Sequence, residues 1–292
     1  MKISGITKVC GVMGCPIEHT MSPMMHNFYS ECTGVDMVYE AFHVEPERVG
    51  DAVRGAYALG LTGLNVTVPH KQAVMEYLSD IDEGAKTIGA VNTLVRVADG
   101  YKGYNTDAEG IWRAMQKAGM TVQGRVCILI GAGGAAKAAA YILAREGAKK
   151  VYVLNRSLEK AEVLAGEINR QMNRPVLYPL QLDQWREIEE SGCLAVQTTS
   201  VGMHPQVDAA PIEDGAFYQK LDQAFDAIYT PMETRFMKLA KEAGAKTANG
   251  LDMLLYQGII AYELWNPDVK ITEETADQAR ELLKNWLGGK GR

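Results

Sequence analysis

The sequence predicts an α/β protein of two domains, each built around a mostly parallel sheet. The chain has 292 residues, too long for one ordinary compact domain and comfortable for two. Predicted strands alternate with predicted helices along most of the chain, a pattern typical of parallel sheets with helical crossovers. A second series begins where an apolar strand near residue 126 enters a glycine-rich turn, and we place the domain boundary ahead of that strand, after residue 108.

Composition is typical of a globular protein and argues against several classes of partner. Apolar residues make up 47% and charged residues 23%, and the formal net charge is −6. An acidic chain without a cluster of Lys and Arg is a poor partner for nucleic acid. The N-terminus lacks the pattern of a signal peptide, and no apolar stretch is long enough to span a bilayer. We therefore expect no nucleic-acid partner, no membrane association and a cytoplasmic location.

The cysteines and histidines lack the spacing of a disulfide framework or a metal site. Five cysteines, an odd number, are scattered without a C-x-x-C pair, and five histidines show no H-x-x-x-H pattern. Buried, reduced thiols are the expected state of such cysteines. The sequence therefore predicts no metal.

The first half of the chain is predicted to alternate strands with helices and to end in a hairpin. A short apolar run ends in Gly14-Cys15-Pro16, and residues with helical spacing follow Ser22-Pro23. Ala98-Asp99-Gly100 supplies the hairpin turn. The predicted strands are 9–13, 37–44, 63–68, 90–97 and 100–104, and the predicted helices are 24–29 and 46–59.

The second half repeats the alternation. A helical pattern through Ile111, Met115 and Ala118 leads to an apolar strand at 126–130, and an alanine-rich helix then runs to Arg145. Further strands are predicted at 151–155, 194–198 and 223–228, and the chain ends in helices at 251–265 and 272–286.

A glycine-rich segment fits the G-x-G-x-x-A fingerprint of dinucleotide-binding domains. It lies between the strand at 126–130 and the alanine-rich helix, and consists of Gly131, Ala132, Gly133, Gly134, Ala135 and Ala136. Gly131 allows a tight turn, Gly133 lets the backbone approach a pyrophosphate, and the start of the helix offers free N–H groups. Such a turn can also serve structure alone, but its position between strand and helix favours dinucleotide binding.

The end of the next strand indicates which dinucleotide is bound. Sites selective for NAD place Asp or Glu there, whereas an Arg suits the 2′-phosphate of NADP. This chain has Asn155-Arg156-Ser157, with Lys160 a turn later. The planar, permanently charged Arg156 can stack or make paired hydrogen bonds to phosphate, so we favour NADP over NAD. The structural alternative is an arginine that is merely exposed to solvent.

Several polar segments of the first half end predicted strands. Asn65 and Thr67 lie two residues apart on one face of a strand, and Lys71 follows its carboxyl end, where ligands of parallel sheets collect. Asn92 and Asp107 occur in similar segments that begin with glycine. Taken singly, Lys71 reads as a solvated lysine at a helix start, Asp107 as a helix N-cap and Asn92 as a turn former.

Together, these motifs resemble those of the shikimate dehydrogenase family. The matching segments keep the family's order and cover nearly the whole chain: 14–23 with His26-Asn27, 65–71, 89–93, 105–110, 131–138, 226–234, and 249–254 with Gln257. The resemblance implies a substrate-binding and catalytic domain at 1–108, completed by C-terminal helices at 249–292, and a Rossmann dinucleotide-binding domain at 109–248. It also implies NADP-dependent, reversible reduction of 3-dehydroshikimate to shikimate, a step of chorismate and aromatic amino acid biosynthesis.

The resemblance also implies a role for each matching residue. Lys71 and Asp107 would be the catalytic pair. The ring hydroxyls would be bound by Asn65, Thr67, Asn92 and Gln257, and the carboxylate by Thr20, Ser22 and Tyr229. The cofactor would be contacted by Gly131, Ala132, Gly133, Gly134, Ala135, Asn155, Arg156, Ser157, Lys160, Ala227 and Gly250, with Glu83 a further candidate.

The chemistry of the implied reaction agrees with these residue types. Reduction of a carbonyl carbon builds negative charge on its oxygen, so a positioned ammonium can stabilise that charge and deliver the proton. Lys71 suits this role, and Asp107 would orient Lys71 and bind a neighbouring hydroxyl. The protonation state of Lys71 is open, because a nearby carboxylate favours the charged amine and burial favours the neutral one.

Two positions depart from the family's pattern. Thr20 stands where the family usually has Ser, and Gln197 where it usually has Asn. The added methyl group of Thr20 leaves open a quinate/shikimate dehydrogenase that uses NAD or NADP, because such enzymes tolerate one more ring hydroxyl. A third hypothesis is a non-catalytic NADP-responsive binding protein. The presence of both Lys71 and Asp107 argues against it. The sequence leaves open whether the chain is a monomer or a homodimer.

Overall fold

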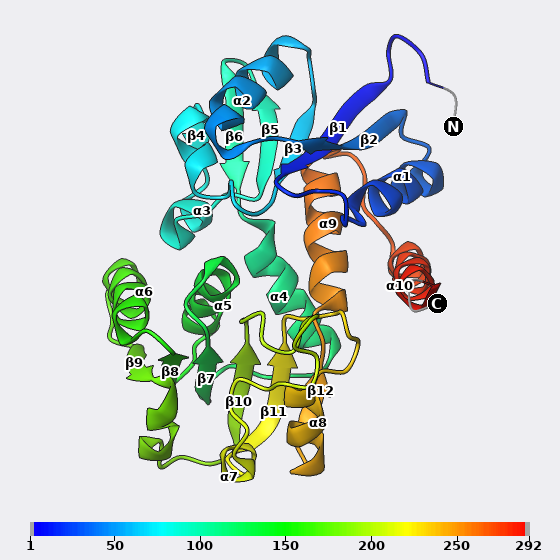
Figure 1. Cartoon of the computed structure of the whole chain (residues 1–292). Coiled ribbons are helices and arrows are strands. Elements are labelled where there is room, and N and C mark those ends of the chain that lie inside the picture. The colour runs from blue at the N-terminus through cyan, green and yellow to red at the C-terminus, as the bar shows by residue number, and fades with distance from the viewer. Residues whose placement is uncertain (1–2, 290–292) are drawn as a thin grey trace. The chain divides into compact units, whose positions relative to one another are not determined.

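The computed structural model describes residues 3–289, which form two compact units (Figure 1). One unit extends to Thr106 and resumes at Leu255, and the other comprises Asp107–Leu254. Within the described residues, each unit contains one six-stranded sheet with helices packed on it. The α/β fold class predicted from the sequence is confirmed.

The first unit is a mixed sheet. Its strands are β1 (Lys8–Gly14), β2 (Met37–His43), β3 (Gly63–Val66), β4 (Asp80–Ile81), β5 (Thr93–Val97) and β6 (Gly100–Tyr104), and its helices are α1 (Ser22–Thr33), η1 (Pro46–Arg48), α2 (Val49–Ala58), η2 (Ala73–Tyr77), α3 (Glu83–Ile88) and α10 (Glu273–Gly289). The strand order is β2-β1-β3-β5-β6-β4. β1 is parallel to β2 and β3, while β5 is antiparallel to β3 and β6, the latter pair being the predicted hairpin.

Two predicted elements of this unit end earlier or are divided in the structure. The strand expected over 63–68 ends at Val66, and Pro69, which has no N–H to donate, lies in the following turn. The helix expected over 46–59 begins as the 3₁₀ helix η1 and continues as α2, with Pro46 at the first position, where its missing N–H matters least.

The C-terminal part of the chain completes the core of the first unit. The helix α9 (Leu251–Trp265) ends in a buried tryptophan whose Nε1 donates to the carbonyl of Leu94 at 2.9 Å. The indole lies against Gly63, where a Cβ would be 2.0 Å from Nε1. A Cβ on Gly258 would lie 2.2 Å from Cε of Met25 in α1. Both glycines therefore permit a close approach that no larger residue allows.

The second unit is a doubly wound parallel sheet. Its strands are β7 (Val126–Ile130), β8 (Lys150–Asn155), β9 (Leu177–Gln181), β10 (Cys193–Gln197), β11 (Leu221–Asp226) and β12 (Lys246–Ala248), and its helices are α4 (Thr106–Lys117, whose first residue belongs to the first unit), α5 (Gly134–Arg145), α6 (Leu158–Gln171), η3 (Leu182–Glu187), α7 (Gly215–Tyr218) and α8 (Arg235–Glu242). The strand order is β12-β11-β10-β7-β8-β9, with every pair parallel. The order reverses between β7 and β10, the place where such sheets bind ligands at the carboxyl ends of their strands.

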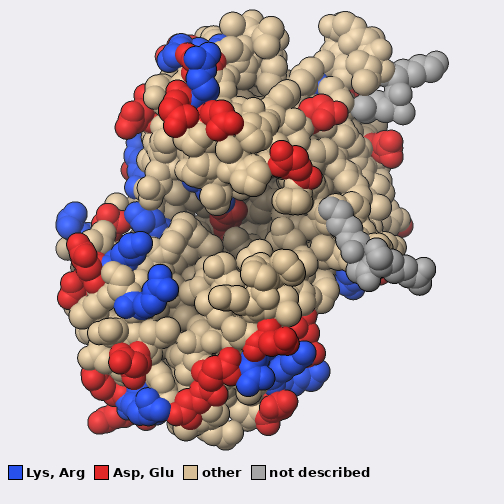
Figure 2. Space-filling model, in the orientation of Figure 1, with Lys and Arg blue, Asp and Glu red and all other residues tan. Residues whose placement is uncertain are grey.

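Charged side chains of both signs share the surface. On the face shown in Figure 2, Lys and Arg are interspersed with Asp and Glu. One paired example is Arg125, whose Nη1 contacts both carboxylate oxygens of Asp222 at 2.7 and 2.9 Å. Among the described residues, no helix has both the length and the apolar character needed to cross a membrane.

Candidate functional site

A network of buried polar side chains lies at the centre of the first unit's sheet. Asn65 in β3 donates from Nδ2 to the carbonyl of Asn92 at 3.1 Å and to Oγ1 of Thr93 at 3.0 Å. Its Oδ1 accepts from the hydroxyl of Tyr39 at 2.7 Å. Oδ1 of Asn92 accepts from the backbone N–H of Thr106 at 2.7 Å, and its Nδ2 donates to Oγ1 of Thr106 at 3.0 Å. Because each amide makes several bonds, the orientations of both side chains are fixed.

Lys71 lies just beyond the carboxyl end of β3, as predicted, in a turn whose backbone is held on several sides. Its carbonyl accepts from the N–H of Val91 at 2.8 Å. The preceding His70 is 1% exposed, and its Nε2 lies 2.7 Å from the carbonyl of Val44. The N–H of His70 donates to the carbonyl of Thr67 at 2.9 Å. The backbone at Lys71 is thus fixed, while its side chain is half-buried.

Asp107 is buried in the first turn of α4, one residue after Thr106. It therefore lies inside the helix, whereas the N-cap reading would place it ahead of the first turn. A carboxylate in the first turn is stabilised by the positive end of the helix dipole. The bond from the N–H of Thr106 to Asn92 fixes the start of this helix.

Thr20 and Ser22 form a hydroxyl pair where α1 begins. Oγ1 of Thr20 donates to Oγ of Ser22 at 3.1 Å and accepts from the N–H of Ser22 at 3.2 Å. Gln257 lies on α9 and is half-buried, one residue before the glycine that packs against Met25 of α1. The structure thus brings the first two residues together and places the third on a helix in close contact with α1.

His26 belongs to the first of the segments that match the family, and it is fully buried. Its ring stacks on that of Tyr39, with centroids 4.2 Å apart and planes 12° apart. Burial lowers the pKa of His26 to about 3, so the imidazole is neutral at physiological pH. The hydroxyl of the stacked Tyr39 bonds to Asn65. The ring of His26 therefore helps to hold Tyr39 in place within the buried hydrogen-bond network. Its burial depends on long-range packing, which no local pattern indicates.

In the second unit, the glycine-rich loop has the geometry that its sequence predicts. Gly131 has a φ of +115°, and a Cβ there would lie 2.6 Å from Oγ1 of Thr198. A Cβ on Gly133 or Gly134 would meet no atom within 4 Å. α5 begins at Gly134, and Ala136 packs fully buried behind it. The space ahead of the helix start and its free N–H groups suit a pyrophosphate.

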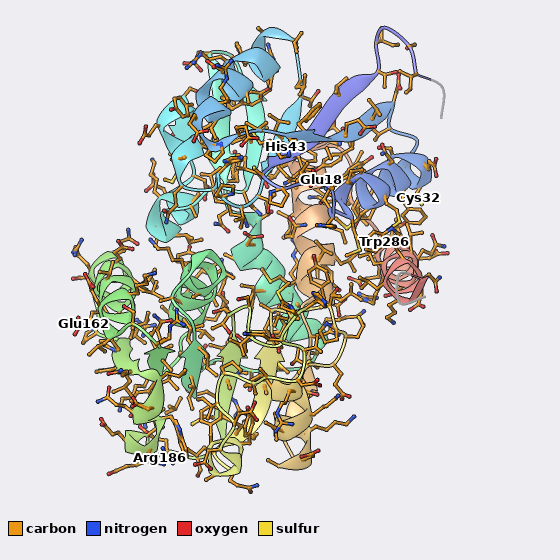
Figure 3. The ribbon with its side chains drawn as sticks, viewed as in Figure 1. Glu18, Cys32, His43, Glu162, Arg186 and Trp286 are labelled. Atoms are coloured by element: carbon orange, nitrogen blue, oxygen red, sulfur yellow. The ribbon has the colours of Figure 1, made fainter. Side chains whose placement is uncertain are left out.

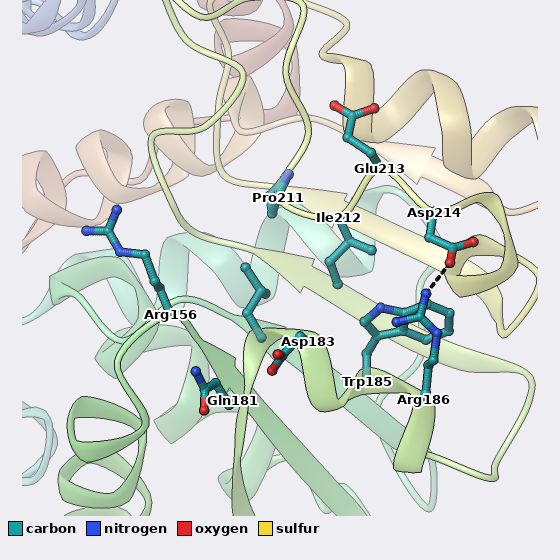
Figure 4. A pocket seen from close by; sticks show the side chains of 10 residues that line it. Arg156, Gln181, Asp183, Trp185, Arg186, Pro211, Ile212, Glu213 and Asp214 are labelled. Carbon is teal, nitrogen blue, oxygen red and sulfur yellow. Dashed lines mark hydrogen bonds and ion pairs between the residues drawn. The ribbon is translucent and has the colours of Figure 1, made fainter.

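Arg156 follows β8 and lines an open cavity of about 400 Å³ (Figure 4). Arg186 and Asp214 close one end of this cavity with an ion pair of 2.5 Å between Nη2 and Oδ2. The remaining wall residues come from the end of β9, from η3 and from the segment before α7: Gln181, Leu182, Asp183, Trp185, Pro211, Ile212 and Glu213. Arg156 is exposed, so its guanidinium is accessible to a ligand.

A second cavity, of about 230 Å³, lies between the glycine-rich loop and α6. Ala132 of the loop, Lys137 of α5 and Lys160 of α6 line it, and Nζ of Lys137 also pairs with Oε2 of Glu167 at 3.0 Å. Asn155, at the end of β8, donates from Nδ2 to the carbonyl of Ser157 at 2.9 Å and so shapes the turn that carries Arg156. Two lysines thus stand beside the loop that suits a pyrophosphate.

The loop after β11 is held by a buried carboxylate. Asp226 accepts from the N–H of Ile228 at 3.0 Å and from the hydroxyl of Thr234 at 2.6 Å. Burial raises the pKa of Asp226 to about 6. A Cβ on Gly250 would lie 2.0 Å from the carbonyl oxygen of Ala227. The structure therefore brings Ala227 and Gly250, two predicted cofactor residues, into close backbone contact.

Gln197 uses its extra length within the same loop cluster. Its Nε2 donates to the carbonyl of Thr199 at 3.2 Å and to Oδ1 of Asp226 at 3.3 Å. The glutamine therefore ties the end of β10 to the loop after β11. Tyr229, on that loop, is half-buried, and desolvation raises the pKa of its hydroxyl. Glu83, by contrast, begins α3 in the first unit, is exposed and pairs with Lys86 at 2.7 Å.

The second unit is a doubly wound sheet with this glycine-rich loop, and the first carries buried amides and a lysine on a fixed turn. This combination defines a nicotinamide-dependent oxidoreductase. Family models agree: that of the shikimate dehydrogenase substrate-binding domain matches residues 12–94, and that of shikimate/quinate 5-dehydrogenase matches residues 113–188. The chain belongs to the shikimate dehydrogenase family.

Individual relatives match over most of their length. A shikimate dehydrogenase (NADP(+)) of Caldanaerobacter subterraneus subsp. tengcongensis is 42% identical, and the match covers 91% of this chain and 94% of the relative. A Listeria monocytogenes shikimate 5-dehydrogenase, solved with shikimate and NAD, is 32% identical with a TM-score of 0.89, covering 97% and 98% of the two chains. The Thermus thermophilus enzyme, solved with NADP(H) and shikimate, is 31% identical with a TM-score of 0.81, covering 94% and 98%.

Proposed function

We propose that the chain catalyses the reversible, NADP-dependent reduction of 3-dehydroshikimate to shikimate. The observation that carries the proposal is the placement of Lys71 in the turn beyond the carboxyl end of β3, the strand that carries the buried amide of Asn65, which bonds to the carbonyl of Asn92. The substrate-binding and catalytic domain is proposed to be 1–108 with 249–292, and the dinucleotide-binding domain 109–248.

Polar side chains of the first unit are proposed to bind the ring acid. Asn65, Thr67, Asn92 and Gln257 are candidates for the ring hydroxyls, because fixed amides discriminate strongly between ligands with and without a matching hydroxyl. The hydroxyl pair of Thr20 and Ser22 is a candidate for the carboxylate, and Tyr229 of the second unit is proposed as a third donor. The bonds of Asn65 and Asn92 hold each amide in one orientation, and a second lone pair on Oδ1 of Asn65 is the acceptor proposed for a ring hydroxyl.

The residues of the second unit fit NADP. The open positions at Gly133 and Gly134 and the start of α5 suit the pyrophosphate. The turn after β8 carries Arg156 and no carboxylate, and Lys160 follows a turn later, so a 2′-phosphate meets cationic groups. Bound NADPH supplies the hydride. Ala227 and Gly250 complete the proposed contacts of the second unit, and Glu83 of the first unit is a further candidate.

Lys71 and Asp107 are proposed to manage the charge and the proton. As the carbonyl carbon is reduced, negative charge develops on its oxygen, and the Lys71 ammonium stabilises that charge and donates the proton. In the reverse direction the neutral amine accepts the proton from the alcohol. Asp107 orients Lys71 and accepts a hydrogen bond from a neighbouring hydroxyl.

Steady-state kinetics with shikimate and quinate, each with NADP⁺ and NAD⁺, test the proposal. We expect the highest kcat/KM for shikimate with NADP⁺. A clear preference for quinate with NAD⁺ would replace the proposal by the quinate/shikimate alternative, which Thr20 leaves open. Tight NADPH binding without turnover of either acid would instead favour the binding-protein alternative. A cytoplasmic location and a monomeric or homodimeric state stay predictions.

A further inference from the structure

Three metal-ligating side chains converge beyond the ends of β1 and β2, outside the residues proposed for catalysis. Cys15 follows β1, His43 is the last residue of β2, and Glu45 lies two residues further on. β1 and β2 pair in parallel with Gly14 opposite His43, and the N–H of Val44 donates to the carbonyl of Gly14 at 3.1 Å. This register brings together side chains that lie 28 and 30 residues apart in the chain.

The sulfur–nitrogen spacing matches that around a tetrahedral zinc ion, and each of these two atoms has a different oxygen of Glu45 close to it. Sγ of Cys15 lies 3.5 Å from Nε2 of His43 and 3.7 Å from Oε2 of Glu45. Nε2 of His43 lies 3.1 Å from Oε1 of Glu45. With ordinary zinc–ligand bond lengths and tetrahedral angles, the edges to sulfur are about 3.6 Å and the nitrogen–oxygen edge is about 3.3 Å. A rotation of the exposed Glu45 carboxylate, which brings one oxygen near both atoms, lets the three side chains share one ion.

A fourth side chain lies where a carboxylate commonly supports a metal-bound histidine. Nδ1 of His43, the ring nitrogen not facing the cysteine, lies 3.7 Å from Oε1 of Glu18. Both residues are labelled in Figure 3. A histidine that ligates metal usually gives its other N–H to a carboxylate or carbonyl, which fixes the ring and its tautomer. Carboxylate oxygens of Glu18 and Glu45 lie 3.7 and 3.1 Å from the two ring nitrogens of His43, so two carboxylates gather at a position that a cation would neutralise.

We propose that Cys15, His43 and Glu45 bind one Zn²⁺ ion, with a water molecule in the fourth position. Thiolate, imidazole and carboxylate are all ordinary zinc ligands, and the sulfur favours a borderline metal over Mg²⁺ or Ca²⁺. The thiol proton leaves to solvent as the Zn–S bond forms, and neither an oxidant nor a reductant takes part. His43 and Glu45 are 43% and 60% exposed, so water has access to the open position. The site is formed by residues distant in sequence, which explains why the cysteine and histidine spacing predicted no metal.

Cobalt provides the first test. The full chain, freed of metal with a chelator, is titrated with Co²⁺ and then with Zn²⁺ under anaerobic conditions. The proposal expects a thiolate-to-cobalt charge-transfer band that saturates at one equivalent and disappears on displacement by Zn²⁺. Absence of the band, or binding without its loss on addition of Zn²⁺, would overturn the proposal.

Matched variants identify the ligands. Cys15→Ser or His43→Gln should weaken Zn²⁺ by roughly 100-fold or more, measured by competition with a chromophoric chelator, and Glu18→Gln by about tenfold. Cys32→Ser and Glu31→Gln serve as controls, because Cys32 is an exposed free thiol on α1 and Glu31 is the exposed carboxylate next to it in the chain. Equal losses in Cys32→Ser and Cys15→Ser would place the metal elsewhere and overturn the proposal.

Alkylation of the wild-type protein tests whether the sulfur of Cys15 is a ligand. The result does not depend on the folding of any variant. Zn²⁺ should slow modification of Cys15 by iodoacetamide at least tenfold, followed by peptide mass spectrometry, while the rate at Cys32 stays constant. Equal rates at Cys15 with and without Zn²⁺ would show that the sulfur is no ligand.

Discussion

The two units offer different kinds of chemical group to their proposed ligands. In the first, the proposed ligand groups are side chains, and Asn65 and Asn92 are held in a buried hydrogen-bond network. In the second, the glycine-rich loop offers backbone N–H groups and empty space, with the long cationic side chains of Arg156 and Lys160 around it. The first unit should therefore be sensitive to the identity of single side chains, and the second to added volume and lost charge.

The largest effect is expected at the proposed proton donor. Lys71→Ala should lower kcat by 100- to 10,000-fold, the usual contribution of general acid–base catalysis, while KM for shikimate changes much less. Steady-state kinetics in the direction of shikimate oxidation measure both. Lys270→Ala is the control, because Lys270 is 77% exposed and pairs with Glu263 on the surface. An unchanged kcat in Lys71→Ala would remove this residue from the chemical step.

Loss of a network amide should act on stability as well as on substrate binding. Asn92→Ala leaves the N–H of Thr106 without the acceptor at 2.7 Å that fixes the start of α4. We expect the free energy of unfolding to fall by about 2–3 kcal/mol, measured by urea denaturation. Gln278→Ala, at an exposed position of α10, should change it by less than about 0.5 kcal/mol. Equal stabilities of the two variants would show that the network is dispensable.

In the second unit a lost charge should affect one cofactor selectively. Arg156→Ala should weaken NADPH by about 10- to 100-fold, the range for hydrogen bonds to charged groups, and leave NADH within about twofold. Fluorescence titration of each nucleotide measures this. Arg186→Ala lines the same cavity and is the matched control, because its guanidinium already pairs with Asp214. Equal losses of NADPH and NADH affinity in Arg156→Ala would refute recognition of the 2′-phosphate.

The smallest expected effect is a change in the free energy of unfolding with pH. One buried group in each unit contributes to it, and the two contributions have opposite signs. The pKa of His26 falls from 6.5 to about 3 on folding, so the unfolded chain binds more protons and stability is lost as pH drops below 6.5. The pKa of Asp226 rises from 3.8 to about 6, so the folded chain binds more protons and stability is gained as pH drops below 6. Between pH 7 and pH 5 we expect a loss of about 2 kcal/mol from His26 and a gain of about 1 kcal/mol from Asp226.

Urea denaturation at both pH values separates the two contributions. His26→Phe should abolish the loss of stability between pH 7 and pH 5 and leave the protein more stable at pH 5 than at pH 7. Asp226→Asn should abolish the gain and make the acid-induced loss steeper. The same pH dependence in wild type and both variants would contradict the assignment of these slopes to His26 and Asp226.

Local patterns predict the long elements and their order, while the ends of several strands differ by two or three residues. The strand 126–130 and the helix 251–265 have the predicted bounds, because their apolar residues are continuous or closely spaced. The edge strands β4 and β12 have only two and three residues, partly exposed, so they lack a readable alternation. Their pairing with longer neighbours creates them, and that pairing is a tertiary property.

The candidate site also has one part that local sequence predicts and another that only tertiary contacts create. Lys71 was predicted because the carboxyl end of a parallel strand is a local feature of the sequence. The support given by His70 to the turn at Lys71, and by His26 to Tyr39, arises from contacts 26 and 13 residues away, which no spacing rule reports. The walls of the Arg156 cavity come from segments near 183 and 213, so only the folded sheet could reveal that cavity.

The return of the chain to the first unit has a consequence for synthesis. The indole of Trp265 fills a place against Gly63 and bonds to Leu94, although about 170 residues separate it from that carbonyl. A ribosome therefore releases the whole of the second unit before the first unit receives its last core residues. Domains generally fold as units as they emerge. We expect the part of the protein that is made first to reach its native state last.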